Sequence, residues 1–160
     1  MYQIRKAELS DLPRILGIYA YARDFMVKTG NPNQWGTTNP PKGQLQEDIA
    51  REKLYVVCRD DEIRGVFFFD IGEDPTYKMI YDGQWLASKE YGTIHRIASD
   101  GSGGILNACV AFCEKLCPYL RIDTHADNKV MQHALEKQGF HRCGIIYIAD
   151  GSPRIAYDRI

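Results

Sequence analysis

The stretch from Tyr91 to Cys117 (YGTIHRIASDGSGGILNACVAFCEKLC) changes abruptly from a strand pattern to a helix pattern. Glycine-rich residues 100–104 separate the two, and an apolar helix is predicted from Ile105. Glycines let a backbone approach an anion closely, and the first N–H groups of a helix lack partners and attract negative charge. The stretch therefore predicts a phosphate-binding turn, although a solvated connection fits the glycines equally well.

Two common phosphate motifs do not fit this turn. No Lys-Ser or Lys-Thr follows Gly104, so the turn is not a P-loop. A dinucleotide fingerprint would need a third glycine where this chain has Leu106.

Size and composition predict an ordinary globular domain. The chain has 160 residues, of which 44% are hydrophobic and 26% charged, so we expect one domain spanning residues 1–160. The net charge of −1 and the lack of a basic stripe argue against nucleic acid as a partner. No apolar run approaches the ~20 residues of a membrane span, and the N-terminus does not resemble a signal peptide.

The cysteines favour a reducing compartment. Their number is odd, and no export signal accompanies them, so we expect free thiols in the cytoplasm. Cys109, Cys113 and Cys117 recur every four residues and share one helical face. Zinc sites normally use closer Cys-x-x-Cys pairs, so we interpret these three as small core residues and expect no metal.

Periodicity and turn residues predict the remaining elements. Helices are expected at residues 12–26, with Ser10 as the N-cap, at 44–54, from 105 and at 128–138. Strands are expected at residues 2–7, 55–58, 63–71, from 91, 119–124, 140–148 and 154–160, with a further short strand at 77–81. A strand–helix–strand crossing over residues 91–124 implies a parallel pair, whereas hairpins imply antiparallel pairs. The fold class is therefore a mixed α/β sheet.

Two segments, IHRIASDGSGGILNACVAF and DNKVMQHALEKQGF, resemble the GNAT family of acyl-CoA-dependent N-acyltransferases. The order of elements matches that family over nearly the whole chain. The resemblance implies a twisted, mostly antiparallel sheet, a central parallel pair that splays apart, and helices on both faces. It also implies acetyl-CoA as the acyl donor.

The resemblance also assigns a cofactor site. It implies that main-chain groups of Ile97, Ala98 and Ser99 hold the pantetheine amides. Asn128 is implied to hydrogen-bond the pantetheine arm, with Met131 packed nearby; Asn128 also suits a plain N-cap, and we expect both roles. The residues implied to hold the pyrophosphate are Gly101, Ser102, Gly103, Gly104, Ile105 and Leu106.

Three positions depart from the family pattern. Gly101 stands where the family turn usually has Gln or Arg, and Leu106 where it has Gly or Ala. Leu135 stands where many members have a tyrosine that protonates the leaving thiolate. Backbone donors remain in the turn, but the usual acid is absent or replaced.

Acyl transfer to an amine needs a base more than it needs an acid. Freeing the lone pair of an alkyl amine at pH 7 costs about 4.6 kcal/mol, whereas expelling an unprotonated thiolate costs about 2 kcal/mol. His95 and His125 are the candidate bases, although each could equally make a structural hydrogen bond. Glu90 is a weaker candidate base, and Tyr147 is a candidate acid. A backbone N–H of residues 97–99 would polarise the thioester carbonyl.

The sequence thus predicts an N-acetyltransferase that transfers acetyl directly to a primary amine of a small molecule or peptide in a ternary complex. The acceptor pocket is expected from residues 31–43, 72–89 and 149–153, in which Trp35 either anchors its loop or lines the site. Exposed strands near the C-terminus could pair two chains into a homodimer. Two alternatives remain: a coenzyme A-binding sensor without chemistry, and a nucleotide-binding module.

Overall fold

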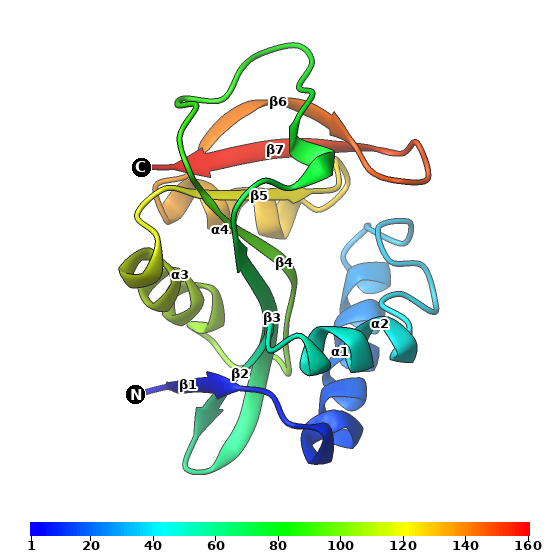
Figure 1. Ribbon diagram of the computed structural model, residues 1–160. Coiled ribbons are helices and arrows are strands. Elements are labelled where there is room, and N and C mark those ends of the chain that lie inside the picture. Colours follow the sequence, from blue (N-terminus) through cyan, green and yellow to red (C-terminus); the bar gives the residue numbers. More distant parts are fainter.

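A single seven-stranded sheet of order β1-β2-β3-β4-β5-β7-β6 organises the computed structural model, which describes residues 1–160 (Figure 1). The helices are α1 (Leu12–Lys28), α2 (Lys42–Ala50), α3 (Ile105–Leu116) and α4 (Lys129–Lys137), with short 3-10 turns at Leu9–Asp11 and Pro75–Tyr77. The strands are β1 (Gln3–Lys6), β2 (Leu54–Arg59), β3 (Glu62–Ile71), β4 (Gly92–Ser99), β5 (Leu120–Thr124), β6 (His141–Tyr147) and β7 (Pro153–Arg159).

The predicted splayed parallel pair is confirmed. β4 and β5 are the parallel neighbours in the sheet, and they pair only at Gly92 with Leu120 and at Thr93 with Arg121. Beyond Thr93 the two strands diverge (Figure 1), so the edge of β4 that faces β5 has no partner strand from residue 94 onward. Every other pair of neighbours is antiparallel.

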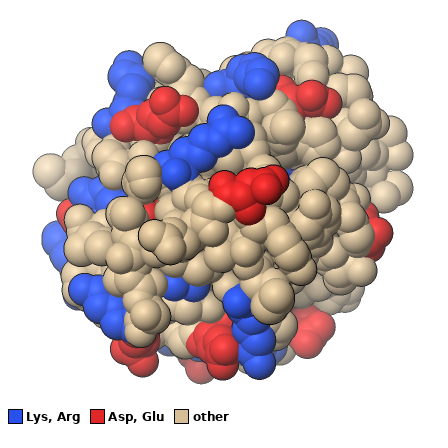
Figure 2. All heavy atoms as spheres, turned by 90° about the horizontal axis from the view of Figure 1, so that it is seen from above, with Lys and Arg blue, Asp and Glu red and all other residues tan.

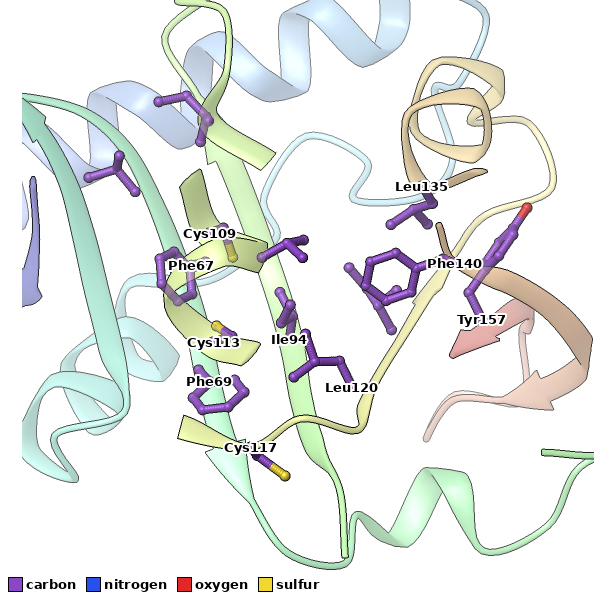
Figure 3. Close-up of a cluster of buried hydrophobic side chains, with 14 of the residues drawn as sticks. Phe67, Phe69, Ile94, Cys109, Cys113, Cys117, Leu120, Leu135, Phe140 and Tyr157 are labelled. Carbon is purple, nitrogen blue, oxygen red and sulfur yellow. The ribbon is translucent and has the colours of Figure 1, made fainter. Parts of the chain in front are cut away.

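Helices cover both faces of the sheet, as expected. α1 and α2 pack on one face through a buried cluster that includes Tyr19 and Phe68. On the other face, α3 packs onto Phe67 and Ile94, and the same buried cluster extends to α4 (Figure 3). This cluster includes Cys109 and Cys113 of α3 and Cys117, which directly follows the helix. The interpretation of these three cysteines as core residues is therefore confirmed.

The segment between β3 and β4 covers the C-terminal half of the sheet. Within this segment, the ring of Tyr77 packs with Tyr119 and Ile146. Ile122 lies on the opposite face of the sheet, in the cluster that includes Leu135 of α4. The short strand predicted at residues 77–81 is wrong. The chain forms a 3-10 turn at Pro75–Tyr77, and only Tyr81 pairs with Ile145, beside the outer edge of β6. The contacts that set this conformation are to distant strands, so local pattern does not reveal them.

Two predicted element boundaries are also wrong. The second helix does not reach Leu54, because Glu52 takes a left-handed φ of 58° and Leu54 pairs with Phe68 at the start of β2. Ser10 does not cap α1. It lies inside the 3-10 turn Leu9–Asp11, and Asp11 directly precedes the helix.

No helix combines the length and apolar character needed to cross a bilayer. On the face drawn in Figure 2, acidic and basic side chains are interspersed, and neither sign forms a continuous patch.

Candidate active site

A cavity of about 430 Å³ lies where β4 separates from β5. It runs along the end of β4 and the following turn, between α1 and α4. All of the residues that the resemblance assigns to the cofactor line it except Gly103: Ile97, Ala98, Ser99, Gly101, Ser102, Gly104, Ile105, Leu106, Asn128 and Met131. The fold therefore brings the predicted cofactor residues together in one cleft.

The glycine turn presents free backbone donors beside this cleft. Gly101 and Gly104 have left-handed φ angles of 98° and 82°, which side chains rarely adopt. The first hydrogen bond of α3 runs from Ala108 to Gly104, so the N–H groups of residues 103–107 have no partner within the chain. Such a row of donors at a helix start suits a diphosphate.

Two arginines reach the turn from elsewhere in the sequence, where Asp100 and, for Arg64, Glu62 offset their charge. Asp100 bonds the N–H of Ser102, and Arg14 and Arg64 both contact its other oxygen at 3.1 Å. Burial alone would raise the pKa of Asp100, but the bonds from Ser102 and Arg64 outweigh it and lower that pKa. Two arginines thus lie next to the turn, although Gly101 occupies the position where the family usually has a basic or amide side chain.

Asn128 caps α4 and contacts the long loop after α1. Its Oδ1 accepts the N–H of Met131 at 3.0 Å, which confirms the predicted N-cap. Its Nδ2 donates to Gln34 at 2.9 Å, and Gln34 also accepts from Asn31. The cap therefore ties the 31–43 loop to the cleft.

A bulge in β4 sets the direction of the strand beside the cleft. Arg96 has a left-handed φ of 53°, and the pairing of β3 with β4 shifts there by one residue. The carbonyl of Arg96 accepts the Tyr19 hydroxyl at 2.6 Å, and its guanidinium contacts buried Asp48 at 2.9 Å. The same guanidinium lies 4.6 Å from the ring centre of Phe68. Helices α1 and α2 thus stabilise an uncommon backbone conformation at this point.

A second cavity of about 610 Å³ adjoins the first. Residues from the 31–43, 72–89 and 149–153 segments, which were predicted to build the acceptor pocket, all line it. Trp35 lines this cavity and also packs edge-on against Tyr19, with 5.5 Å between the ring centres. It therefore both lines the site and anchors its loop to the core. Four residues line both cavities: Met26, Ile97, Asn128 and Met131.

An imidazole between two carboxylates stands in the larger cavity. His95 Nε2 lies 2.8 Å from Asp74, and His95 Nδ1 lies 3.8 Å from Asp123. Tyr77 donates its hydroxyl to that Asp123 oxygen at 2.6 Å. With Nε2–H donated to Asp74, the neutral imidazole has an unshared pair at Nδ1, in the gap next to Asp123. An ammonium group placed beside these two atoms, and not in line between them, can contact both.

Hydrogen bonding keeps Asp74 ionised. Burial alone would raise its pKa, but the bonds from His95 and Thr76 and the charge of His95 outweigh burial and lower the pKa to about 2. Burial, followed by the nearby charge of Asp123, raises the pKa of Tyr77, so Tyr77 remains a hydrogen-bond donor at neutral pH.

The low pKa of Asp74 predicts a pH-dependent contribution to stability. Folding lowers this pKa from 3.8 to about 2, so the contribution is complete above pH ~4 and disappears as pH falls toward 2. The shift corresponds to at most about 2 kcal/mol, since the side chain is partly solvent-exposed. The difference in unfolding free energy between wild type and Asp74→Asn, measured with urea, should therefore shrink between pH 5 and pH 2. A difference that stays constant over that range would contradict this assignment.

The other predicted catalytic residues lie outside both cavities. His125 follows β5, and its Nδ1 accepts the N–H of Asp127 at 2.9 Å; burial, and then the charge of Arg154, lower its pKa. Tyr147 is exposed and packs edge-on against Tyr81 at 5.4 Å. Leu135 is fully buried in the core, so its position offers no group to the site. Glu90, His133 and His141 are exposed.

Sequence reasoning did not single out Asp74 or Asp123, and it named Tyr77 only as a candidate aromatic residue of the acceptor pocket. Asp74 and Tyr77 belong to a segment without regular periodicity, and Asp123 lies inside a strand that looked ordinary. The available signals were weak: Asp74 precedes a proline, as at many turns, and Asp123 is a polar residue at the carboxyl end of a central strand. Arg154, at the start of β7, was not singled out either.

Comparison with known proteins identifies the fold. No family model and no curated protein matches the chain. Among solved structures, a GNAT-family acetyltransferase from Streptococcus agalactiae is 30% identical, with a TM-score of 0.90, over 99% of this chain and 95% of that one. A Staphylococcus aureus protein described as an acetyltransferase is 25% identical, with a TM-score of 0.71, over 98% of this chain and 97% of that one.

A more distant structure shares the fold alone. The ribosomal-protein-alanine N-acetyltransferase of Brucella melitensis is 18% identical, with a TM-score of 0.65, over 99% of this chain and 99% of that one. The near-full coverage of the Streptococcus agalactiae structure, the splayed β4–β5 pair and the glycine turn at the start of α3 lead to one conclusion. The chain belongs to the GNAT family of acetyltransferases.

Proposed function

We propose that this protein transfers an acetyl group from acetyl-CoA directly to a primary amine, with both substrates bound at once. The observation that carries the proposal is the junction of two cavities at Ile97 and Met131. One cavity is bordered by free backbone donors, and the other contains an imidazole between carboxylates. Donor and acceptor can therefore meet without an enzyme-bound acyl group, and all five cysteines are buried.

The donor cleft fits coenzyme A. The unpaired edge of β4 offers main-chain groups of Ile97, Ala98 and Ser99 to an amide-bearing arm. The N–H groups of residues 103–107 suit the diphosphate. Bound coenzyme A would supply an acyl thioester, which is the electrophile of the reaction. A main-chain N–H of residues 97–99 polarises its carbonyl oxygen.

On the acceptor side, His95 is the general base. An ammonium that enters the gap between His95 and Asp123 hydrogen-bonds the carboxylate and faces the free Nδ1. His95 takes a proton there, which leaves the amine with a lone pair for attack. Asp74 stays ionised at neutral pH, so it orients the His95 ring and stabilises the resulting imidazolium.

Leu135 stands at the position where many family members have the tyrosine that protonates the leaving thiolate. Leu135 is buried, and exposed Tyr147 lines neither cavity, so we assign no side-chain acid to the thiolate. Loss of that acid costs about 2 kcal/mol at pH 7, which slows the reaction without preventing it.

Ligand binding tests the donor half of the proposal. Acetyl-CoA should raise the melting temperature of the protein, and ATP or NAD should not compete with it. In Gly104→Ala, the left-handed φ of 82° becomes strained and the free donors lose alignment, so acetyl-CoA should bind about 10-fold more weakly.

A matched variant separates strain from binding. Gly151 has a similar φ of 86° in the β6–β7 turn, with open space around its Cα, and it lies outside the donor cleft. Gly151→Ala should lose a comparable ~1 kcal/mol of stability but keep wild-type affinity for acetyl-CoA. Stabilisation by ATP or NAD alone would overturn the proposed function in favour of a nucleotide-binding module.

A further inference from the structure

Arg154 carries a buried charge that the protein itself does not neutralise. It is only 6% exposed, lies at the start of β7 and lines the acceptor cavity. Its Nη1 donates to the Pro153 carbonyl at 2.9 Å and its Nη2 to the Gln34 carbonyl at 3.3 Å. A guanidinium has five N–H groups, so most of its donors remain available.

Arg121 is also buried, but its charge has partners within the protein. The guanidinium of Arg121 lies 3.9 Å from the ring centre of Tyr91 and 4.1 Å from that of Trp85, so aromatic faces meet its charge. Arg96 and Arg159 contact carboxylates at 2.9 and 2.6 Å. Arg154 has neither kind of partner, and burial lowers its pKa despite the more distant charges of Asp123 and Asp150.

The cavity therefore has two opposite poles. Asp123 pairs with Ala156 across β5 and β7, so Arg154, two residues earlier, is its diagonal neighbour on the same face. Diagonal neighbours in a sheet are roughly 7–8 Å apart. An acidic pole next to His95 and a basic pole at Arg154 thus share one cavity at a separation that a small zwitterion can span.

We propose that the acceptor is a small amino acid whose carboxylate pairs with Arg154 while its amine occupies the gap between His95 and Asp123. This inference rests on the proposed acetyl transfer and narrows its acceptor. An unpaired buried arginine favours a ligand that brings its own carboxylate, because a bidentate pair of this kind is strong and directional.

A purely structural role for Arg154 makes a different prediction. Its bond to the Gln34 carbonyl links β7 to the 31–43 loop, so removing it could disturb the pocket for every acceptor alike. Arg154→Gln removes both the charge and that bond, because the shorter amide does not reach the Gln34 carbonyl. Each amino acid should therefore be compared with its own amide, which differs only in the carboxylate.

The experiment measures kcat/KM by thiol release with acetyl-CoA, using L-amino acids and the matched amino-acid amides. Wild type should prefer the acids, and Arg154→Gln should lose on the order of 100-fold with acids and much less with amides. Arg154→Lys should recover part of the preference. Arg142→Gln, an exposed arginine on β6 outside the cavity, should keep the wild-type ratio. Comparing ratios between variants cancels the different amine pKa values of acids and amides.

Wild type that uses amides, or amines without a carboxylate, as well as acids when rates are compared per unprotonated amine would overturn this inference and leave the proposed acetyl transfer intact. Equal losses with acids and amides in Arg154→Gln would show a structural role and overturn it too. No thiol release with any amine, despite acetyl-CoA binding, would overturn the proposed transfer and this inference with it.

Discussion

His95→Gln should lower turnover by roughly 10²–10⁴-fold at pH 7 while acetyl-CoA affinity changes little. The imidazole is the group beside Asp123 whose free nitrogen lone pair can accept the ammonium proton. His95 does not line the donor cleft, so acetyl-CoA binding should persist. Thiol-release kinetics and a binding titration on the same samples measure the two quantities.

The loss of turnover in His95→Gln should become smaller as pH rises. As pH rises toward the pKa of the amine, more acceptor arrives already deprotonated, so the variant should recover relative to wild type. Asp74→Asn should show a smaller loss, because an amide can still accept the Nε2–H but cannot stabilise an imidazolium by charge. His141→Gln, exposed at the start of β6, serves as the matched control.

Two results would count against this role. Full turnover in His95→Gln would remove His95 as the base and return attention to His125. Wild-type protein that binds acetyl-CoA yet acetylates no amine would favour the alternative of a sensor that retains the fold and the cofactor.

Asp48→Ala should lower the free energy of unfolding by about 3 kcal/mol. Asp48 is fully buried and bonds Arg96 at 2.9 Å and Gln44 at 2.9 Å. Its removal leaves the Arg96 guanidinium without its carboxylate, at a residue that already holds a left-handed φ. This expected loss of about 3 kcal/mol is at the lower end of the range for breaking a buried ion pair, because the Arg96 side chain is 23% exposed.

Urea denaturation measures this loss against a surface control. Asp24→Ala removes an exposed pair with Lys28 on α1 and should lower the free energy of unfolding far less than Asp48→Ala. Asp48→Ala should also weaken acetyl-CoA binding, since Arg96 directs the strand that borders the cleft. A loss below 1 kcal/mol would mean that the bulge does not need this pair.

Sequence could predict the elements whose signals are local. The strand, glycine turn and helix at residues 91–117 follow from patterns within one stretch, and so do the Asn128 cap and the end of α4. The 72–91 segment could not be predicted. Its conformation depends on bonds such as Leu86 N–H to Asp158 and Arg121 to the Ala87 carbonyl, whose partners lie on strands far along the chain.

The candidate site likewise combines residues with local sequence signals and residues that only the fold brings together. The proposed cofactor residues are nearly contiguous, so one motif predicts most of them. The acceptor side draws on segments that only the sheet brings together: Asp74 before β4, Asp123 on β5 and Arg154 on β7. His95 could be proposed from the sequence because histidine is a common general base, whereas an aspartate or arginine near a turn usually faces solvent.

The wall common to both cavities links two specificities. Ile97 and Met131 line both cavities, so in the proposed reaction they would border the thioester of one substrate and the amine of the other. Trimming either side chain to admit a longer acyl chain would also enlarge the room beside the amine. Selection for a new donor would therefore alter which acceptors fit, and the two preferences would evolve together.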